Sequence, residues 1–196
     1  MSHLKRIVVS CGDPYGIGPE VALKAMLKLD VLQHSGVAVI IYLPKDLLDF
    51  YESYNKMQQV EKIEKVDAPG LYYILMDEKN CPAFNAKLIG NASAEGGKIA
   101  KCAIDACIND CLRGTAQAMC TAPIAKYAMQ LASLSIFGHT EYLAVKSNAP
   151  HVIMLLASGK LRVALQTIHI PVCEIPAMIT RDSIFSMLRV LNHELE

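Results

Sequence analysis

Short apolar runs alternate along this chain with longer segments in which apolar residues recur at helical spacing. Residues 37–43 (VAVIIYL) are apolar without alternation, which is typical of a strand covered on both faces. The β-branched run at residues 6–10 (RIVVS) predicts a second strand. Further strands are predicted over residues 71–76 and 116–121, and helices over 21–29, from Pro44 onward, over 93–112, from the loop at 122–126 to about Leu134, and over 180–196.

The C-terminal third of the chain predicts a different strand pairing. Residues 152–157 and 161–168 are separated by only three residues (SGK), which is too short for a crossover, so an antiparallel hairpin is expected. The last segment is an amphipathic helix with Thr180 as its candidate N-cap. Together with the alternation of strands and helices before it, this pattern predicts an α/β fold with mixed, largely parallel sheets flanked by helices.

Composition narrows the classes of function. The 196 residues carry 19 Lys and Arg against 19 Asp and Glu, so there is no basic footprint for nucleic acid. Hydrophobic residues make up 53% and charged residues 19%, which excludes a disordered chain. No apolar run approaches the roughly 20 residues that span a bilayer, so no membrane partner is expected. The seven cysteines form no CxxC pair, which favours buried thiols in a reducing cytoplasm.

Two loops that follow predicted strands could bind an anion. The turn at residues 11–20 (CGDPYGIGPE) leads into a helix and contains three glycines, but it is neither GxGxxG nor a P-loop. It is either a tight strand-to-helix turn or a ligand site. In the loop at residues 121–126 (TAPIAK), Lys126 is either solvated or faces an anionic substrate from the carboxyl end of a strand.

Histidines mark two further candidate segments. In GHTE at residues 138–141, His139 and Thr140 either donate to a phosphate or carboxylate, or Thr140 caps a helix and His139 is a half-buried ring. In TIHIP at residues 167–171, His169 follows a strand and could be a metal ligand, an acid or base, or a structural residue. No HxxxH or HxxE pattern gives His169 a local partner, so any metal would need distant ligands.

The predicted helix over 93–112 contains three cysteines, which could form a metal cluster or pack in the core. Their spacing favours core packing. At 100° per residue, Cys107 and Cys111 share one face of the helix, whereas Cys102 lies far around it. We therefore expect these thiols to be small core residues.

Five segments, taken together in their order along the chain, resemble the 4-hydroxythreonine-4-phosphate dehydrogenase family of vitamin B6 synthesis. They are IVVSCGDPYGIGPEVALKA near the start, SAEGG at 93–97, TAPIAK at 121–126, GHTEYLA at 138–144 and LASGKLRVALQTIHIP at 156–171. The resemblance implies a two-lobe fold like that of isocitrate and isopropylmalate dehydrogenases, and a homodimer. It places a first lobe at residues 1–122 and the start of a second at 123–196, both incomplete.

The resemblance also implies an activity. The family oxidises 4-phosphohydroxy-L-threonine with NAD or NADP, and the β-keto acid product decarboxylates to 3-amino-2-oxopropyl phosphate. His139 and Thr140 match its substrate-binding pair. His169 matches the first of three histidines that hold a divalent metal (zinc, magnesium or cobalt), which polarises the substrate alcohol. The resemblance does not identify the catalytic or cofactor-binding residues of this chain.

The chain departs from the family pattern beside these residues. Phe137, Ala125 and Ile168 stand where the family has proline, asparagine and threonine. The family's chain also continues beyond this one, with the other two metal histidines, the phosphate-binding basic residues and most of the NAD site. Three alternatives therefore stay open: a dehydrogenase of a related phosphorylated hydroxy acid, an enzyme like the phosphate acyltransferases, or an inactive fragment. The 196-residue chain alone is expected to be inactive.

Overall fold

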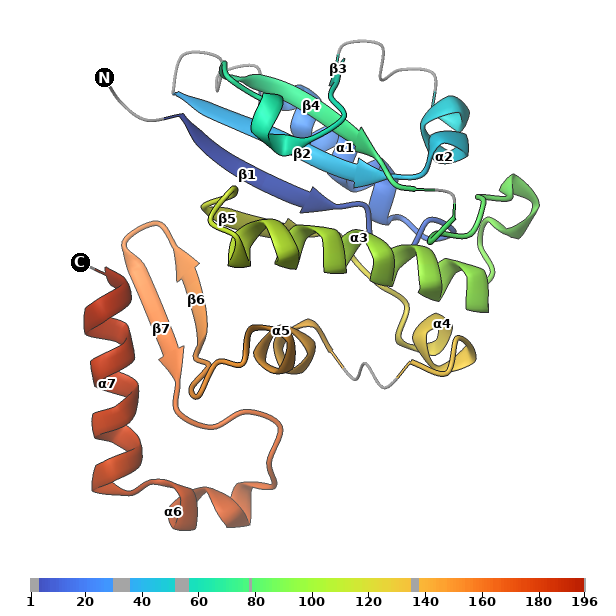
Figure 1. Cartoon of the computed structure of the whole chain (residues 1–196). Helices are drawn as coiled ribbons and strands as arrows, with labels where there is room; N and C mark the ends of the chain where they lie inside the picture. Colours follow the sequence, from blue (N-terminus) through green and yellow to red (C-terminus); the bar gives the residue numbers. More distant parts are fainter. Residues whose placement is uncertain (1–3, 30–35, 52–56, 78, 135–137, 196) are drawn as a thin grey trace. The chain divides into compact units, whose positions relative to one another are not determined.

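The computed structural model describes residues 4–29, 36–51, 57–77, 79–134 and 138–195, with no side-chain description for 194 and 195. The chain divides into two compact units, Met1–Phe137 and Gly138–Glu196, each of which is described by itself (Figure 1). The predicted lobe boundary between residues 122 and 123 refers to the complete two-lobe fold and stays a prediction.

A parallel sheet forms the centre of the first unit. Its strand order is β3-β4-β2-β1-β5, and every neighbouring pair is parallel. The strands are β1 (Lys5–Ser10), β2 (Val37–Leu43), β3 (Gln58–Gln59), β4 (Gly70–Leu75) and β5 (Ala118–Thr121). Six of the seven residues of β2 are buried, as expected for a strand covered on both faces.

Helices cover both faces of this sheet. In Figure 1, α1 lies behind the strands and α3 lies in front of them. Helix α1 connects β1 to β2 on one side of β1, and α3 leads to β5 on the other side. Because crossovers between parallel strands are right-handed, connections that run in opposite directions along the sheet lie on opposite faces. The helices and short 3₁₀ turns of the unit are α1 (Gly18–Lys28), α2 (Lys45–Phe50), η3 (Ile63–Lys65), η4 (Ala86–Leu88), α3 (Ala94–Leu112) and α4 (Lys126–Leu131).

The first turn of α3 is fixed by a cap and by close packing. Ser93 is the N-cap, and its hydroxyl accepts a hydrogen bond from the Gly96 amide at 3.1 Å. A Cβ on Gly97 would lie 2.3 Å from the carbonyl oxygen of Ala128 in α4. Only glycine therefore lets α3 and α4 approach this closely.

A buried hydrogen bond ties β2 to the other end of α3. The Tyr42 hydroxyl donates to Asp110 Oδ2, and the Thr115 hydroxyl donates to Asp110 Oδ1 at 3.2 Å. Tyr42 is 9% exposed and Asp110 is 6% exposed. Burial, followed by the hydrogen bond to Asp110, raises the pKa of Tyr42 well above its usual range, so the phenol stays protonated.

The Tyr42→Phe substitution should destabilise the chain by about 2 kcal/mol, because a buried carboxyl oxygen loses its donor. The free energy of unfolding in urea, followed by circular dichroism, measures this cost. Tyr73→Phe is the matched control, since the Tyr73 hydroxyl donates to Gln59 in an exposed bond at 3.3 Å. Its cost should stay below about 0.5 kcal/mol. Equal costs for the two variants would contradict a special contribution from the Tyr42–Asp110 bond.

The second unit contains the predicted antiparallel hairpin, which is confirmed. Strand β6 (Met154–Ser158) pairs with β7 (Leu161–Leu165). The Ser183 amide donates to Thr180 Oγ1 at 3.1 Å and the Thr180 amide donates to Ser183 Oγ at 3.0 Å, which confirms Thr180 as the N-cap. The remaining elements are α5 (His139–Ser147), η5 (Val172–Glu174), α6 (Ile175–Met178) and α7 (Arg181–Leu195).

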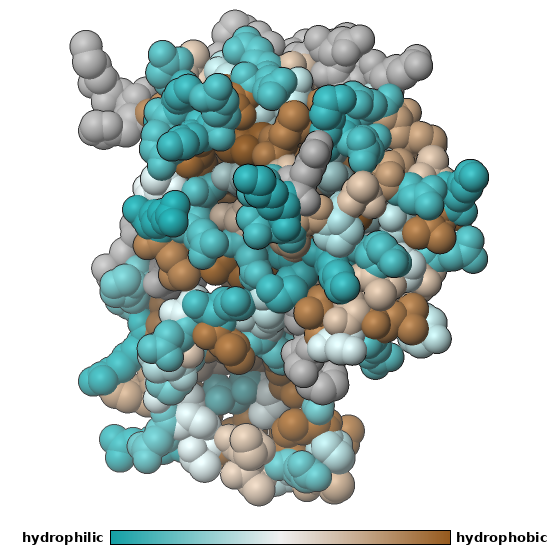
Figure 2. All heavy atoms as spheres, turned by 45° about the vertical axis from the view of Figure 1, so that its right-hand side comes forward, coloured by the Kyte–Doolittle hydropathy of each residue, from teal (hydrophilic) through white to brown (hydrophobic). Residues whose placement is uncertain are grey.

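Hydrophobic side chains remain exposed in the second unit. None of the side chains described between residues 138 and 193 is fully buried. Val145 is 78% exposed and Val172 is 81% exposed. On the face that Figure 2 shows, hydrophobic residues lie at the surface among hydrophilic ones. A unit that leaves this much apolar surface in water gains little from the hydrophobic effect.

Some predicted elements differ from the observed ones. The first helix begins at Gly18, three residues before the predicted start. Helix α4 ends at Leu131 rather than near Leu134, because Ser133 takes a left-handed conformation with φ of 56°. The short strand β3 has no apolar pattern and was not predicted. In the described part of the chain, no helix combines the length and apolarity that a bilayer crossing needs.

Candidate functional site

The first unit has a topological switch point between β1 and β5. From β1 the chain proceeds to β2 on one side, and it returns later to β5 on the other side. In open parallel sheets, ligands bind outside the carboxyl ends of the strands at such a point. The two loops that the sequence singled out, which follow β1 and β5, meet there.

The two loops are in direct contact. The Asp13 amide donates to the carbonyl oxygen of Pro123 at 2.9 Å. Gly12 has a φ of 74°, and a Cβ on it would lie 2.4 Å from the same oxygen. A Cβ on Gly18 would lie 2.9 Å from it. These glycines therefore let the loop after β1 pack closely against the backbone of the loop after β5. This packing supports the interpretation of residues 11–20 as a tight turn, and it also shapes the switch point.

Two polar side chains that sequence reasoning missed lie at the same strand end. Asp13 is 5% exposed, and its Oδ1 accepts from the Tyr15 amide at 3.1 Å. Burial raises the pKa of Asp13, and this hydrogen bond opposes the rise. A Cβ on Gly96 would lie 2.9 Å from Asp13 Oδ1, so the carboxyl packs against the first turn of α3.

The second missed side chain is Ser10, whose hydroxyl is buried and has no hydrogen-bond partner among the described residues. Buried polar atoms normally have a partner, and Ser10 is 0% exposed, so a buried water molecule is the expected partner of this hydroxyl. The sequence signal for both was a polar residue at the carboxyl end of an apolar strand, because Ser10 is the last residue of β1 and Asp13 follows it by three positions.

Lys126 is the first residue of α4 and its side chain is exposed. This placement agrees with the solvated interpretation. A role of Lys126 toward an anionic substrate stays a prediction.

His139 and Thr140 lie in the first turn of α5. The N-cap is Gly138 and no side chain caps the helix, so the interpretation of Thr140 as a cap is wrong. His139 is half-buried, and its Nε2 atom is buried without a hydrogen-bond partner in the part of the chain that the structure describes. Burial lowers the pKa of His139, so the ring stays neutral at neutral pH. A neutral imidazole with an orphan nitrogen is suited to hydrogen bonding with a ligand.

His169 is exposed in the loop after β7 and has a φ of 55°, which is uncommon for a residue other than glycine. No three His, Cys, Asp or Glu side chains gather as a possible metal cluster among the described residues. One exposed imidazole does not hold a divalent metal, so these residues do not make a metal site. The resemblance to the family places His139, Thr140 and His169 around one substrate and its metal, and this arrangement stays a prediction.

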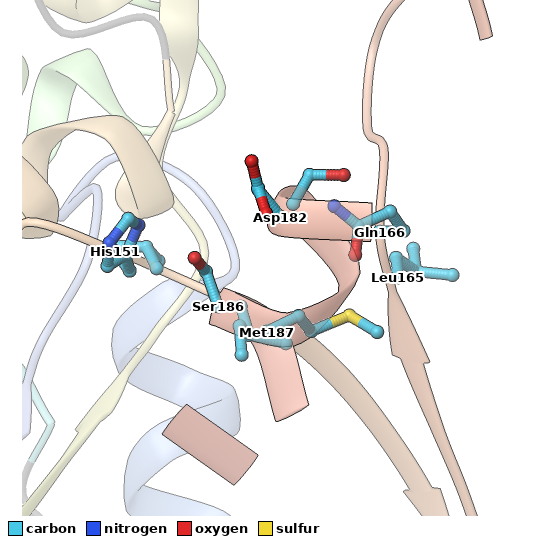
Figure 3. A pocket seen from close by; sticks show the side chains of 9 residues that line it. His151, Leu165, Gln166, Asp182, Ser186 and Met187 are labelled. Carbon is cyan, nitrogen blue, oxygen red and sulfur yellow. The ribbon is translucent and has the colours of Figure 1, made fainter. Parts of the chain in front are cut away.

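The second unit contains a cavity of 320 Å³ that is lined by residues other than the predicted site residues (Figure 3). Asp182, Ser186 and Met187 project from α7, and Leu165 and Gln166 lie across from them at the end of β7. The Gln166 Oε1 atom is buried and without a partner in the described structure. Neither His139, Thr140 nor His169 is among the residues that line this cavity.

The parallel sheet and its switch point define an α/β protein in which a ligand is expected at the carboxyl ends of the strands. The family model of the pyridoxal phosphate biosynthetic protein PdxA matches residues 31–196. The chain belongs to this family. Its fold class, predicted from the sequence, is confirmed by the comparisons with solved structures below.

Curated relatives carry the name 4-hydroxythreonine-4-phosphate dehydrogenase. The protein of Sulfurihydrogenibium sp. is 31% identical over 97% of this chain, and that of Aquifex aeolicus is 29% identical over 97%. The chain spans 58% of the length of each of these relatives.

Solved structures share the fold. A 4-hydroxythreonine-4-phosphate dehydrogenase from Burkholderia phymatum matches 99% of this chain and 59% of its own, with a TM-score of 0.83 and 24% identity. A terephthalate 1,2-cis-dihydrodioldehydrogenase from Burkholderia xenovorans matches 92% of this chain and 53% of its own, with a TM-score of 0.68 and 19% identity.

Proposed function

We propose that this chain carries the substrate-binding part of an oxidoreductase of vitamin B6 biosynthesis. The proposed reaction is the oxidation of 4-phosphohydroxy-L-threonine with NAD or NADP as hydride acceptor, followed by decarboxylation to 3-amino-2-oxopropyl phosphate. The observation that carries the proposal is the family match over residues 31–196, which includes His139, Thr140 and His169. The proposal extends to a homodimer in the cytoplasm.

The geometry of α5 supports a role for His139 and Thr140 in holding the substrate. The first amides of a helix have no intrahelical partner and favour an anionic group. The orphan Nε2 of the neutral His139 ring adds one hydrogen-bonding atom at this position. We assign to the pair the binding and orientation of the phosphorylated substrate.

His169 is proposed as one ligand of a divalent metal, with zinc, magnesium or cobalt as candidates. The other ligands of such a metal would have to come from outside the described residues, since no cluster of three forms among them. The bound metal would act as a Lewis acid toward the substrate alcohol.

A related phosphorylated hydroxy acid is the second candidate substrate. Ala125 and Ile168 depart from the family pattern beside Lys126 and His169, and Phe137, the third departure, lies outside the described residues. The fold is also shared with a dehydrogenase named for a different substrate. Because function depends on the site rather than on the fold, the fold does not distinguish the two candidates.

Isothermal titration of the purified chain with 4-phosphohydroxy-L-threonine tests the substrate role. The His139→Ala and Thr140→Val substitutions should each raise Kd by about 10-fold, the loss of a hydrogen bond to a charged ligand. Thr140→Ser keeps the hydroxyl and should bind like the parent chain. His151→Ala, which removes an exposed histidine of the same unit, is the matched control and should leave Kd unchanged. Absence of binding to the parent chain, or equal Kd values in all variants, would contradict the assignment.

A further inference from the structure

Two cysteines that are 21 positions apart in the sequence lie side by side in the first unit. Cys81 ends the turn that follows β4, and Cys102 lies on α3. Both thiols line a cavity of 220 Å³ together with Tyr42 and Ala106. A hydrogen-bonding interaction links the two side chains. This pair has no part in the proposed substrate site.

The backbone holds Cys81 in this position. The amides of Asn80 and Cys81 both donate to the carbonyl oxygen of Asp77 at 3.0 Å, and the Asp77 carboxylate accepts from the Lys79 amide at 3.0 Å. The Cys102 thiol donates to the Asn80 carbonyl oxygen at 3.2 Å, and the Cys81 thiol donates to the Pro82 carbonyl oxygen at 3.6 Å. The turn therefore packs directly on α3 at the position of the two thiols.

The two thiols differ in exposure and acidity. Cys102 is partly exposed, and the hydrogen bond with Cys81 lowers its pKa to about 7, with Lys101 acting in the same direction and burial opposing. Cys81 is 6% exposed, and the same hydrogen bond, together with burial, raises its pKa. Nucleophilic attack requires an accessible thiolate, and Cys102 is both the more exposed and the more acidic of the two thiols.

A basic cavity adjoins the pair. It has a volume of 470 Å³ and is lined by Lys79, Lys98 and Lys101 as well as by both cysteines. Lys79 and Lys98 are exposed, and Lys101 also forms an ion pair with Asp105 of α3. Positive charge around a partly exposed thiol attracts anionic reagents and stabilises the thiolate.

We propose that Cys102 and Cys81 form a redox-reactive dithiol that exchanges with an anionic low-molecular-weight disulfide held by Lys79 and Lys98. The Cys102 thiolate attacks one sulfur of the reagent, which forms a mixed disulfide and releases one thiolate. The Cys81 thiol then loses its proton and attacks the Cys102 sulfur, which forms the Cys81–Cys102 disulfide and releases the second thiolate. Overall, two protein thiols are oxidised to one disulfide, and one reagent disulfide is reduced to two thiols.

The buried cysteines of the same unit lack these properties. Cys11 and Cys107 are both 0% exposed. Burial raises the pKa of Cys11 to about 12 and also raises that of Cys107. Buried thiols of this kind are inert toward disulfides. Cys120 and Cys173 are exposed and would react without a neighbouring thiol, so the test removes them.

The test uses the full chain with Cys120→Ser and Cys173→Ser as the parent, incubated with oxidised glutathione and mapped by mass spectrometry. The parent should form a Cys81–Cys102 disulfide that dithiothreitol reverses. Adding Cys81→Ala should stop the reaction at a glutathione adduct on Cys102, and adding Cys102→Ser should leave Cys81 unmodified. Circular dichroism of each variant checks that it is folded. A parent that stops at the adduct, or that reacts at neither cysteine, would overturn the proposal.

The lysines are tested by the rate of the same reaction. The double variant Lys79→Gln/Lys98→Gln should react about 10-fold more slowly with oxidised glutathione at low salt, because the local attraction is lost. With the neutral 2-hydroxyethyl disulfide its rate should be unchanged. Lys28→Gln, which removes an exposed lysine outside the cavity, is the matched control for both reagents. Equal slowing with both reagents would overturn the role of the lysines in holding an anion.

Discussion

Replacing Gly12 with alanine is expected to destabilise the first unit far more than the same replacement at Gly114. Both glycines have a positive φ, 74° at Gly12 and 73° at Gly114, so each alanine suffers about 1 kcal/mol of backbone strain. At Gly114 nothing lies within 4 Å of the new Cβ, whereas at Gly12 the Cβ would lie 2.4 Å from the Pro123 oxygen. Relieving that overlap moves backbone on both sides of the switch point, which adds about 1–3 kcal/mol.

Urea unfolding of Gly12→Ala and Gly114→Ala, followed by circular dichroism, measures the difference directly. Because the strain in φ is common to both variants, their difference isolates the contact between the loops after β1 and β5. Equal midpoints and equal slopes in urea would mean that the two loops do not pack as described.

Local signals in the sequence were sufficient for much of the fold. Strand β2 spans residues 37–43, as its apolar run predicts, because a strand covered on both faces needs no alternation. The short connection through Gly159 allows only an antiparallel pair for β6 and β7. Ser93 and Thr180 cap helices with their own hydroxyl groups, which is a property of a few consecutive residues.

Features that depend on distant residues were not predictable in this way. Cys102 lies on a different face of α3 from Cys107, as helical spacing requires, but its contact with Cys81 depends on how the turn after β4 packs on α3. The burial of Asp13 likewise depends on Gly96, more than 80 positions away, which leaves space for the carboxyl. The end of α4 depends on the left-handed conformation of Ser133, a residue type that gives no strong signal for it.

The candidate site shows the same division. Helical and strand signals place His139 and Thr140 at the start of α5 and His169 after β7, as expected from the motifs that contain them. The orphaned state of the His139 Nε2 atom depends on burial by its surroundings and is not encoded in the four letters GHTE. Binding of one substrate by His139, Thr140 and His169 depends on the distances between their side chains, which no local sequence pattern specifies.

The 196-residue chain by itself is expected to show almost no oxidation of 4-phosphohydroxy-L-threonine. A catalytic metal needs about three protein ligands, and the described residues form no such cluster around His169. The chain also spans only 58% of the length of the Aquifex aeolicus relative. Placing the nicotinamide against the substrate carbon accounts for about 7–11 kcal/mol of a barrier, so turnover without that placement should be at least about 10⁵-fold slower.

The assay follows reduced nicotinamide by absorbance, with NAD or NADP and with zinc, magnesium or cobalt, and uses the full-length Aquifex aeolicus relative as the positive control. The binding measurement on His139 and Thr140 is independent of turnover, so a chain that binds substrate without oxidising it would agree with both expectations. Turnover comparable to that of the relative would contradict the present expectation. In that case His169→Ala would be the next variant to assay. Loss of its turnover would show that His169 binds the metal together with other groups of this chain.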